Sequence, residues 1–270
     1  MTFDEIPIKN RLFGIDFCAI FLYNVGNYYG EVGALAEVIA FTSGKGGTGK
    51  TALCAEIAKE LASAGRKVLC IDCQSVYGDL DAYLRLENLP HLTYGEVCTG
   101  QYPLEKATAH PYFSNLRFLA APASRETVDR EAFATLLRQA RAQFDYILLD
   151  DPQDDQTADR YVLVTDANPA AIRGARRKAD MLEVQGKTNV RLVVNSIDIK
   201  HLQVLDLNID DVMDQVGLPL LGIVPYDFGI TVACAQGKNP HSIKKSGAFA
   251  AIYRIAQRIQ GIYTAIPSRL

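Results

Sequence analysis

Apolar residues are distributed along the chain in blocks, and from Glu37 onward short apolar runs recur between longer segments with helical spacing. Uninterrupted runs of about four to eight apolar residues are typical of strands covered on both faces of a parallel sheet. The runs predicted as strands are Glu37–Thr42, Lys67–Asp72, Leu116–Pro122, Tyr146–Asp151, Arg160–Asp166, Arg191–Ser196 and Leu220–Pro225.

The segments between these runs place apolar residues three and four positions apart, which predicts amphipathic helices. The predicted helices are Gly49–Gly65, Asp129–Phe144, Pro169–Val184 and Gly247–Ile259. The first ends at a glycine and the third begins with a proline, as helices often do. Because strands and helices alternate without a repeat or a low-complexity linker, we expect a single doubly wound α/β domain with a mostly parallel sheet.

The first 36 residues do not follow this alternation, and we assign 1–36 to an N-terminal extension and 37–270 to the folded domain. Lys9 and Arg11 precede an apolar stretch, which crudely resembles a signal peptide. Asp16 interrupts that stretch, so an extension without a targeting role is the simpler interpretation. A short hydrophobic contact with a membrane or a partner is the alternative.

Composition limits the class of protein. With 49% hydrophobic and 22% charged residues among 270, the chain can bury a large core, and its net charge of −3 provides no overall attraction to nucleic acid. No segment has the 18 or so uncharged apolar residues of a membrane-spanning helix. The scattered cysteines are typical of buried thiols in a reducing cytoplasm. They are Cys18, Cys54, Cys70, Cys73, Cys98 and Cys234.

The strongest motif is GKGGTGKT at 44–51, between the first predicted strand and the first predicted helix. It fits the phosphate-loop pattern of glycine, four residues, glycine, lysine and then serine or threonine. Its residues are Gly44, Lys45, Gly46, Gly47, Thr48, Gly49, Lys50 and Thr51. Glycines let backbone N–H groups approach phosphate oxygens, the second lysine reaches the β- and γ-phosphates, and the threonine hydroxyl holds Mg²⁺. The motif predicts binding of ATP or ADP with Mg²⁺.

Lys45 has no use within its own loop, because the loop already surrounds the phosphates. This second lysine resembles the signature of the MinD/ParA family of deviant Walker-A ATPases, and the motif order is most similar to the MinD branch. The resemblance covers about Glu37 to Gly261 and implies an ATP-dependent homodimer. In such a dimer each signature lysine neutralises γ-phosphate charge in the opposite site.

The resemblance also implies roles for the strand ends. Asp72 belongs to switch I near the metal, as a catalytic residue and a metal ligand, and Asp150 is the Walker-B carboxylate of the Mg²⁺ shell. Asn195 takes the place of the residue that reads the adenine edge, and Pro225 and Asp227 lie in the loop that packs near the base. All five follow strands at the carboxyl edge of the sheet, where open α/β sheets bind ligands.

Switch I departs from the family pattern of two aspartates separated by one residue. Here Asp72 is followed by Cys73 and Gln74, and glutamine can orient water but cannot accept a proton. Slow hydrolysis and no hydrolysis both remain open, and Asp79 and Asp81 are close enough in sequence to substitute. Ala52 replaces a second threonine and removes one hydrogen bond to phosphate, which costs about 1 kcal/mol of affinity.

The connection after the Walker-B strand is short. Only the residues DPQDDQTADR separate Asp150 from Tyr161, and such a stretch spans at most about 33 Å when extended. Parallel crossovers normally take a dozen or more residues with a helix. We therefore expect a shortened, acidic switch II without a regular helix between Pro152 and Arg160, and one patch of sheet that is less covered.

The C-terminal tail, Gly261–Leu270, has one arginine, a proline and few bulky apolar residues, which makes a poor interfacial membrane anchor. The preceding helix places Phe249, Ile252, Ala256 and Ile259 on one face, which is more simply core. The basic row Arg173, Arg176, Arg177 and Lys178 is more typical of a solvated helix face than of a DNA contact.

The functional expectation is an Mg·ATP-dependent homodimer switch with slow ATP hydrolysis. The resemblance implies a role in positioning the division septum or a similar task, with a division-site or activator protein as partner. The alternatives are a non-catalytic ATP-gated interaction module, with hydrolysis lost at Gln74, and a DNA-positioning ATPase that uses the basic helix. The pair Cys70 and Cys73 has no second pair at metal-site spacing, so core cysteines are the simpler interpretation.

Overall fold

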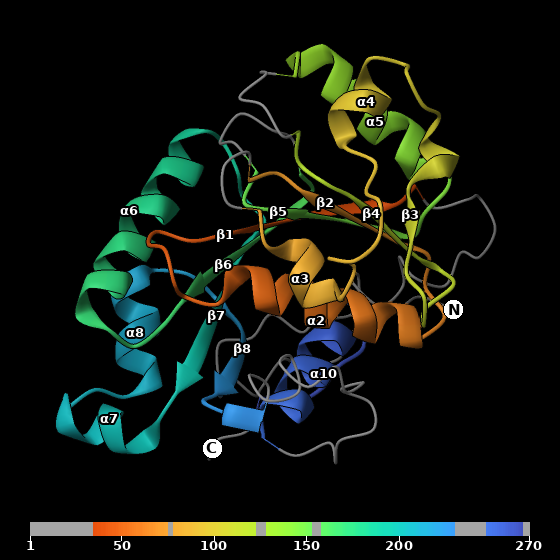
Figure 1. Cartoon of the computed structure of the whole chain (residues 1–270). Helices are drawn as coiled ribbons and strands as arrows, with labels where there is room; N and C mark the ends of the chain where they lie inside the picture. Colours follow the sequence, from red (N-terminus) through yellow and green to blue (C-terminus); the bar gives the residue numbers. More distant parts are fainter. Residues whose placement is uncertain (1–34, 75–77, 123–127, 153–157, 230–246, 267–270) are drawn as a thin grey trace, which may run out of the picture. The chain divides into compact units, whose positions relative to one another are not determined.

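The computed structural model describes residues 35–74, 78–122, 128–152, 158–229 and 247–266 (Figure 1). The proposed N-terminal extension, 1–36, lies outside the described residues except for Leu35 and Ala36. The chain divides into two units, Met1–Ala34 and Leu35–Leu270, and the fold described below is that of the second unit.

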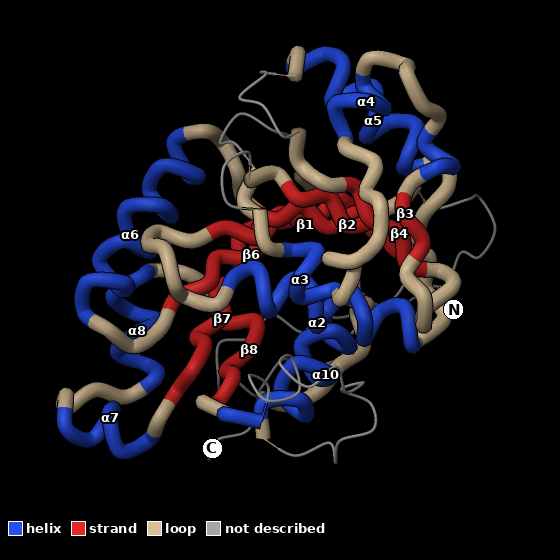
Figure 2. The backbone as a smooth tube through the Cα atoms, viewed as in Figure 1, coloured by secondary structure: helices blue, strands red, loops and turns tan. Residues whose placement is uncertain are grey.

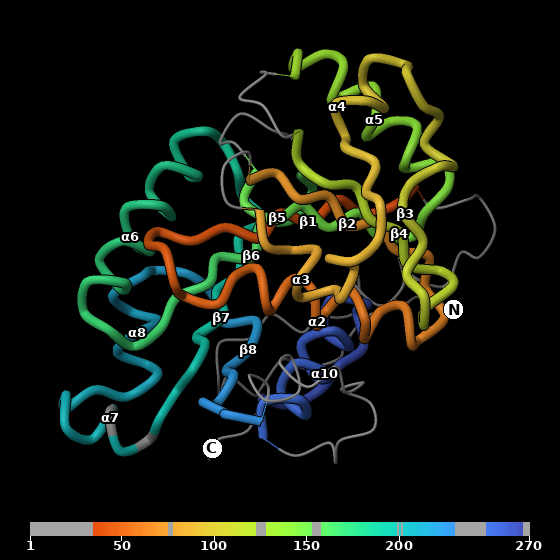
Figure 3. The backbone as a smooth tube through the Cα atoms, viewed as in Figure 1, coloured from red at the N-terminus to blue at the C-terminus, as the bar shows by residue number. Residues whose placement is uncertain are grey.

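Eight strands form one sheet in the order β3-β4-β2-β5-β1-β6-β7-β8. Neighbouring strands are parallel except β3 and β4, which pair antiparallel at one edge. Figure 3 shows that β1, at the start of the described chain, lies between β5 and β6 from its middle. The strand bounds are Glu37–Thr42 (β1), Val68–Asp72 (β2), Thr108–Ala109 (β3), Leu116–Leu119 (β4), Tyr146–Asp150 (β5), Arg160–Thr165 (β6), Val190–Ile197 (β7) and Leu220–Pro225 (β8). The predicted fold class, a doubly wound and mostly parallel sheet, is confirmed.

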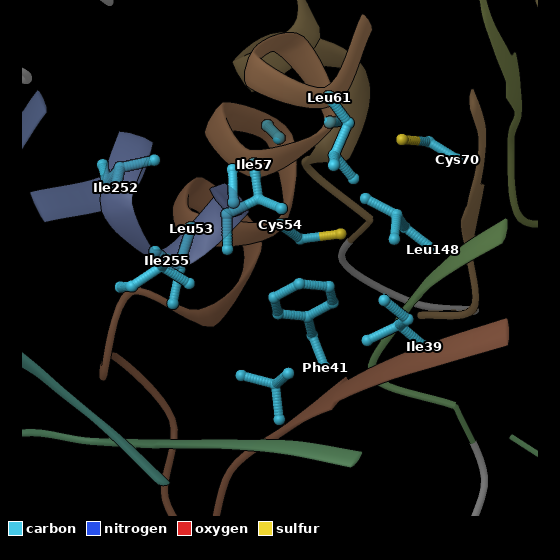
Figure 4. Packing of buried hydrophobic residues seen from close by; sticks show 14 of the residues in the cluster. Ile39, Phe41, Leu53, Cys54, Ile57, Leu61, Cys70, Leu148, Ile252 and Ile255 are labelled. Carbon is cyan, nitrogen blue, oxygen red and sulfur yellow. The ribbon is translucent and has the colours of Figure 1, made fainter. Parts of the chain in front are cut away.

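One face of the sheet is covered by α2 (Lys50–Ser63), α3 (Leu80–Leu84) and α10 (Ala248–Ile259). Figure 2 shows these helices together on one side of the red strands. In β1 the residues Ile39 and Phe41 point to this side, and Figure 4 shows the Phe41 ring near Cys54 of α2. The predicted core face of the last helix is confirmed, since Phe249, Ile252, Ala256 and Ile259 are all buried.

The opposite face carries two groups of helices. α4 (Tyr94–Cys98) and α5 (Arg130–Arg141) cover the half that contains β2, β4 and β5. α6 (Pro169–Val184) and α8 (Ile209–Val216) cover the half that contains β6 and β7. In β1, Val38 belongs to the first group and Ala40 to the second, so alternate residues of this central strand contact all three parts of the core.

Local hydrogen bonds explain where several helices begin. Asn168, directly before Pro169, accepts a hydrogen bond from the Ala170 N–H and caps the helix. α6 therefore begins at Pro169, as the sequence predicted. Asn208 and Asp211 form a capping box at α8. The apolar pattern of the sequence did not predict β3, α3, α4, α8, the 3₁₀ turn Leu104–Lys106 or α7 (Ile199–Val204), all of which are short. It also extended β4 by three residues to Pro122, whereas the strand ends at Leu119.

The short connection after β5 is described only at its ends, because residues 153–157 lie outside the described part of the chain. Asp159 pairs with the start of β1, donating its N–H to Val38 O and accepting the Val38 N–H at its carboxylate, both at 2.8 Å. Ala158 packs against both helix groups of this face. Val38, Ala40 and Leu149 are fully buried, so the expected poorly covered patch is not found at these sheet residues.

Two glycine backbones touch where the loop after β1 meets α6. A Cβ on Gly44 would lie 2.0 Å from the carbonyl carbon of Gly174, and a Cβ on Gly174 would lie 2.7 Å from Gly44 O. Backbone atoms cannot yield as the end of a flexible side chain can. The loop therefore sits on α6 at a distance that only glycine allows.

His110 is buried in the loop after β3, where its Nδ1 accepts N–H groups of Tyr112 and Phe113 at 3.1 and 3.2 Å. Burial lowers the pKa of His110 from 6.5 to about 4, and the charge of Lys59 contributes to this lowering.

Within the described part of the chain, no helix is both long and apolar enough to cross a membrane.

We expect Gly174→Ala to lower the free energy of unfolding by about 1–3 kcal/mol, because the added methyl group overlaps the Gly44 backbone. Alanine would otherwise favour the helix by about 1 kcal/mol. Thermal unfolding measures the change, with Gly46→Ala as the control, since a Cβ there meets no atom within 4 Å. Equal stability of both variants would show that the loop moves freely away from α6.

The free energy of unfolding should fall by about 2–3 kcal/mol between pH 6.5 and pH 4 on account of His110. In that range the unfolded chain binds a proton at this histidine and the folded chain does not. Above pH 6.5 both states are neutral there and the effect vanishes. His110→Asn keeps an acceptor for the two N–H groups but does not titrate. Urea unfolding across this pH range should give a shallower pH dependence for the variant, and an unchanged slope would contradict the assignment.

Candidate functional site

The loop between β1 and α2 has a backbone that favours glycine. Gly47 and Gly49 have φ angles of 84° and 83°, in the left-handed region that other residues rarely adopt. Gly49 is the N-cap of α2 and no side chain caps this helix end. The first N–H groups of α2 are therefore available to an anion, where the helix dipole also favours negative charge.

Asn195, near the end of β7, holds the other side of this loop. Its Nδ2 donates to Thr48 O at 2.8 Å, and a Cβ on Gly49 would lie 2.3 Å from the same nitrogen. The loop thus lies between α6, which contacts Gly44, and β7, which holds Thr48 and Gly49.

Lys50 lies at the base of the loop and is almost fully buried. Its Nζ is 3.3 Å from Asp150 Oδ1 and 3.5 Å from Asp151 Oδ2. Burial raises the pKa of the Asp150 carboxyl, while Lys50 and a hydrogen bond from Thr51 lower it. Removing either partner of this buried ion pair would leave an uncompensated buried charge, which would destabilise the fold.

A cavity of about 580 Å³ opens over this loop. It is lined by Ser43, Gly44, Lys45, Gly46, Gly47, Thr48, Gly49, Lys50, Thr51, Ala52, Gln74, Asp79, Tyr83 and Asp151. We call it the phosphate-side cavity. Its lining includes every residue of the predicted phosphate loop, together with Ala52 and Gln74.

The polar atoms around this cavity fit a magnesium-bound phosphate. Thr48 Oγ1 and Asp150 Oδ2 are buried and have no hydrogen-bond partner among the described atoms. Buried polar atoms without partners are rare in proteins and often mark a place where a ligand, water or ion binds. Within the described residues, no group of three or more His, Cys, Asp and Glu side chains is placed to hold a metal. Mg²⁺ commonly takes only one or two carboxylates, with water and phosphate oxygens as its other ligands.

Asp72 ends β2, and Gln74 follows two residues later and lines the same cavity. Asp72 is paired in register with Asp150 on the neighbouring strand β5. Asp72 is not among the described residues that line the cavity, and its carboxylate oxygens accept the N–H groups of Gln74 at 2.9 Å and Leu80 at 3.3 Å. Burial, with a smaller contribution from the charge of Asp150, raises the pKa of Asp72 to about 6, although the two N–H hydrogen bonds oppose this rise. Gln74 Nε2 donates to Asp151 Oδ2 at 3.3 Å.

A second cavity of about 230 Å³ adjoins the first, and we call it the base-side cavity. It is lined by Gly49, Ala52, Leu53, Glu56, Tyr83, Asn195, Ser196, Val224, Pro225, Tyr226, Asp227 and Ile252. Gly49, Ala52 and Tyr83 line both cavities. The three residues predicted to surround the base, Asn195, Pro225 and Asp227, are thus brought together in this second cavity.

Backbone strain is found at both cavities. Asp151 and Ser196 have φ angles of 52° and 56° although neither is glycine. Asp151 lines the phosphate-side cavity and Ser196 lines the base-side cavity. Residues held in such conformations tend to cluster at ligand-binding sites, so the strain agrees with this location.

Lys45 differs from Lys50 in its surroundings. Its side chain is exposed at the rim of the phosphate-side cavity, and it makes no ion pair with any described residue. The Lys45 backbone carbonyl accepts a hydrogen bond from the Ser43 hydroxyl at 3.0 Å, which stabilises the turn. No contact with a described residue fixes the direction of the Lys45 ammonium group.

Several lining residues carry no clear signal in the sequence. Tyr83 and Glu56 carry no motif, and only their position on α3 and α2 brings them to the cavities. Asp151 directly follows Asp150, the predicted Walker-B carboxylate, and this adjacency is a signal that could have identified it. Of the two aspartates considered as substitutes in switch I, Asp79 lines the phosphate-side cavity, whereas Asp81 lies 3.4 Å from His91 Nε2.

Other predicted features are not at the site. Cys70 and Cys73 are buried with free thiols, in agreement with core cysteines. Arg173, Arg176 and Arg177 are exposed on α6, and Arg176 pairs with Asp180 at 2.9 Å. This agrees with a solvated helix face.

Comparison with known proteins assigns the family. Residues 39–240 match the model of the CobQ/CobB/MinD/ParA nucleotide binding domain. The septum site-determining protein MinD of Synechocystis sp. is 30% identical over 83% of this chain and 90% of its own length.

Solved structures agree. The MinC:MinD cell division protein complex of Aquifex aeolicus superposes with a TM-score of 0.77 and 31% identity, covering 87% of this chain and 99% of that chain. The Pyrococcus horikoshii MinD complexed with Mg-ADP has a TM-score of 0.69 and covers 83% of this chain and 96% of that one, but at 23% identity it supports the fold alone. The chain therefore belongs to the MinD/ParA family of nucleotide-binding P-loop ATPases, and within it the chain is similar to the septum site-determining MinD proteins.

Proposed function

We propose that residues 37–270 form an ATPase domain that works as an Mg·ATP-dependent homodimer switch. The observation that carries this proposal is the contrast between the two lysines of one loop. Lys50 is buried against Asp150, whereas Lys45 is exposed at the cavity rim. A cation in that position is free to reach a nucleotide held by a facing copy.

Within one subunit the loop would bind the phosphates through its backbone N–H groups and Lys50. Thr51 and Asp150 would hold Mg²⁺, which when bound neutralises charge on the phosphate oxygens. The unpartnered Asp150 Oδ2 supports this assignment. Asn195, Pro225 and Asp227 would surround the base in the base-side cavity.

Lys45 of each subunit would stabilise charge on the γ-phosphate of the other site, as an arginine finger supplied in trans does. Both ATP sites would then be complete only in the dimer. Dimer formation would report ATP binding, and hydrolysis would reopen the dimer.

Hydrolysis would be slow because switch I lacks a second carboxylate. Gln74 lines the phosphate-side cavity and can orient water by hydrogen bonds, but it cannot take the proton. Asp72, whose oxygens accept the Gln74 and Leu80 N–H groups, would position Gln74.

The cellular role would be spatial control of the division septum or a similar positioning task, carried out in the cytoplasm. The Aquifex relative was solved as a complex with MinC, which motivates a division protein as partner. DNA and autonomous membrane binding are not part of this proposal.

In single-turnover ATP hydrolysis with Mg²⁺ and excess protein, we expect slow cleavage by the wild type. Lys50→Ala should abolish it through loss of phosphate binding. Lys45→Ala should lower the rate by roughly 10³-fold while ATP still binds. Lys106→Ala, an exposed lysine of the turn Leu104–Lys106, is the control and should match the wild type.

ATP that is bound but never cleaved, even at saturating protein, would exclude the ATPase. It would favour a non-catalytic ATP-gated module with hydrolysis lost at Gln74. Unchanged turnover in Lys45→Ala would instead exclude the role of this lysine in the opposite site.

The dimer can be tested separately by sedimentation velocity. The wild type should be monomeric with Mg·ADP and dimeric with a non-hydrolysable ATP analogue, and Lys45→Ala should shift the monomer–dimer equilibrium strongly to monomer. Lys106→Ala should dimerise normally. Dimers that are equally abundant with ADP, with the ATP analogue and without nucleotide would contradict an ATP-dependent switch.

A further inference from the structure

Glu56 is a buried carboxylate for which the motifs of this chain offer no explanation. It lies on α2, almost fully buried, and it lines the base-side cavity. Burying a charge costs several kcal/mol unless it is paired, and a well-packed apolar pair at the same place is often at least as stable. A role in the stability of the fold therefore does not account for the carboxylate.

The partner of Glu56 fixes one carboxylate oxygen and leaves the other available. Lys59, one turn further along α2, donates to Glu56 Oε1. No described residue donates a hydrogen bond to Oε2 of Glu56. Lys59 also donates to Tyr83 O at 3.2 Å, so the pair connects α2 to α3.

The location of the Glu56–Lys59 pair relative to the two cavities indicates which part of a bound nucleotide the pair would face. Gly49, Ala52 and Tyr83 line both cavities, and Glu56 is four residues after Ala52 on the same face of the helix. In a nucleotide the ribose joins the phosphates to the base. A nucleotide with phosphates in one cavity and base in the other would place its ribose at this junction.

We propose that Glu56 is a specificity-determining residue that accepts a hydrogen bond from a ribose hydroxyl of the bound nucleotide, with Lys59 holding its carboxylate in place. The inference rests on the proposed function, because it requires nucleotide to occupy both cavities. A deoxynucleotide that lacks this hydroxyl would lose the hydrogen bond to the carboxylate. Because charge-assisted hydrogen bonds are about twice as strong as neutral ones, the site selects ribonucleotides over deoxynucleotides.

The test is calorimetric titration of the full chain with Mg²⁺ and ATP, 2′-deoxyATP or 3′-deoxyATP. The measured quantity is the ratio of dissociation constants between each deoxy analogue and ATP. Because it is a ratio within one protein, it does not depend on the folded fraction of a variant. We expect one analogue to bind the wild type about tenfold more weakly than ATP, which corresponds to about 1.4 kcal/mol.

Two variants distinguish a ribose contact from a structural ion pair. The double variant Glu56→Met/Lys59→Met replaces the pair with apolar residues and should reduce the ratio to about one. Glu56→Gln keeps an acceptor for Lys59 but loses the charge, and should reduce the ratio to about threefold or less. Glu60→Gln is the matched control, since Glu60 lies on the same helix but lines neither cavity, and should keep the wild-type ratio.

Equal binding of all three nucleotides by the wild type would overturn the inference while leaving ATP binding intact. The same preference in the wild type and in Glu56→Gln and the double variant would also overturn it. If the double variant does not fold, Glu56→Gln decides. Failure of the wild type to bind ATP at all would overturn the proposed function itself.

Discussion

The geometry of the site depends on two places where the phosphate loop has no room for a side chain. Gly44 contacts the backbone of Gly174 in α6, and Gly49 contacts the amide nitrogen of Asn195 at the end of β7. These contacts hold the loop between a helix and a strand that come much later in the chain. Any movement of the loop on binding phosphate must therefore be shared with α6 or β7, because packed interiors transmit small displacements rather than absorb them.

The charges of the site are arranged around this rigid loop in a region of low exposure. Asp72 and Asp150 end neighbouring parallel strands, and burial raises the pKa of both. Lys50 offsets one of these charges, whereas Asp72 is stabilised by backbone N–H groups of the switch segment that follows it. A phosphate and a metal ion would change the electrostatic balance of all three groups together. In the proposed function, this shared balance would let switch I respond to the nucleotide.

The same helix connects the two halves of the ligand site. α2 provides Lys50 and Thr51 to the phosphate-side cavity and Glu56 to the base-side cavity, and Lys59 ties it to α3 through Tyr83. α3 begins at Leu80, with Asp79 as its N-cap, and the Leu80 N–H donates to Asp72 of the predicted switch I. The base-side cavity is thus linked to switch I through one helix and one ion pair. Nucleotide recognition and nucleotide sensing would share these contacts.

The sequence by itself determined every strand of the sheet except β3, the long helices and the phosphate loop, because each depends on local properties. Apolar runs such as Tyr146–Asp150 form buried strands wherever both faces are covered, and Gly47 and Gly49 allow the loop backbone without help from distant residues. It did not predict α3 or α4, which are five residues long and are stabilised by packing more than by their own propensity. Only the tertiary structure decided that Gly44 touches Gly174, that Tyr83 and Glu56 line the site, and that Asp72 turns its carboxylate toward the switch backbone. These features depend on the distance between elements far apart in the chain, which side-chain periodicity does not encode.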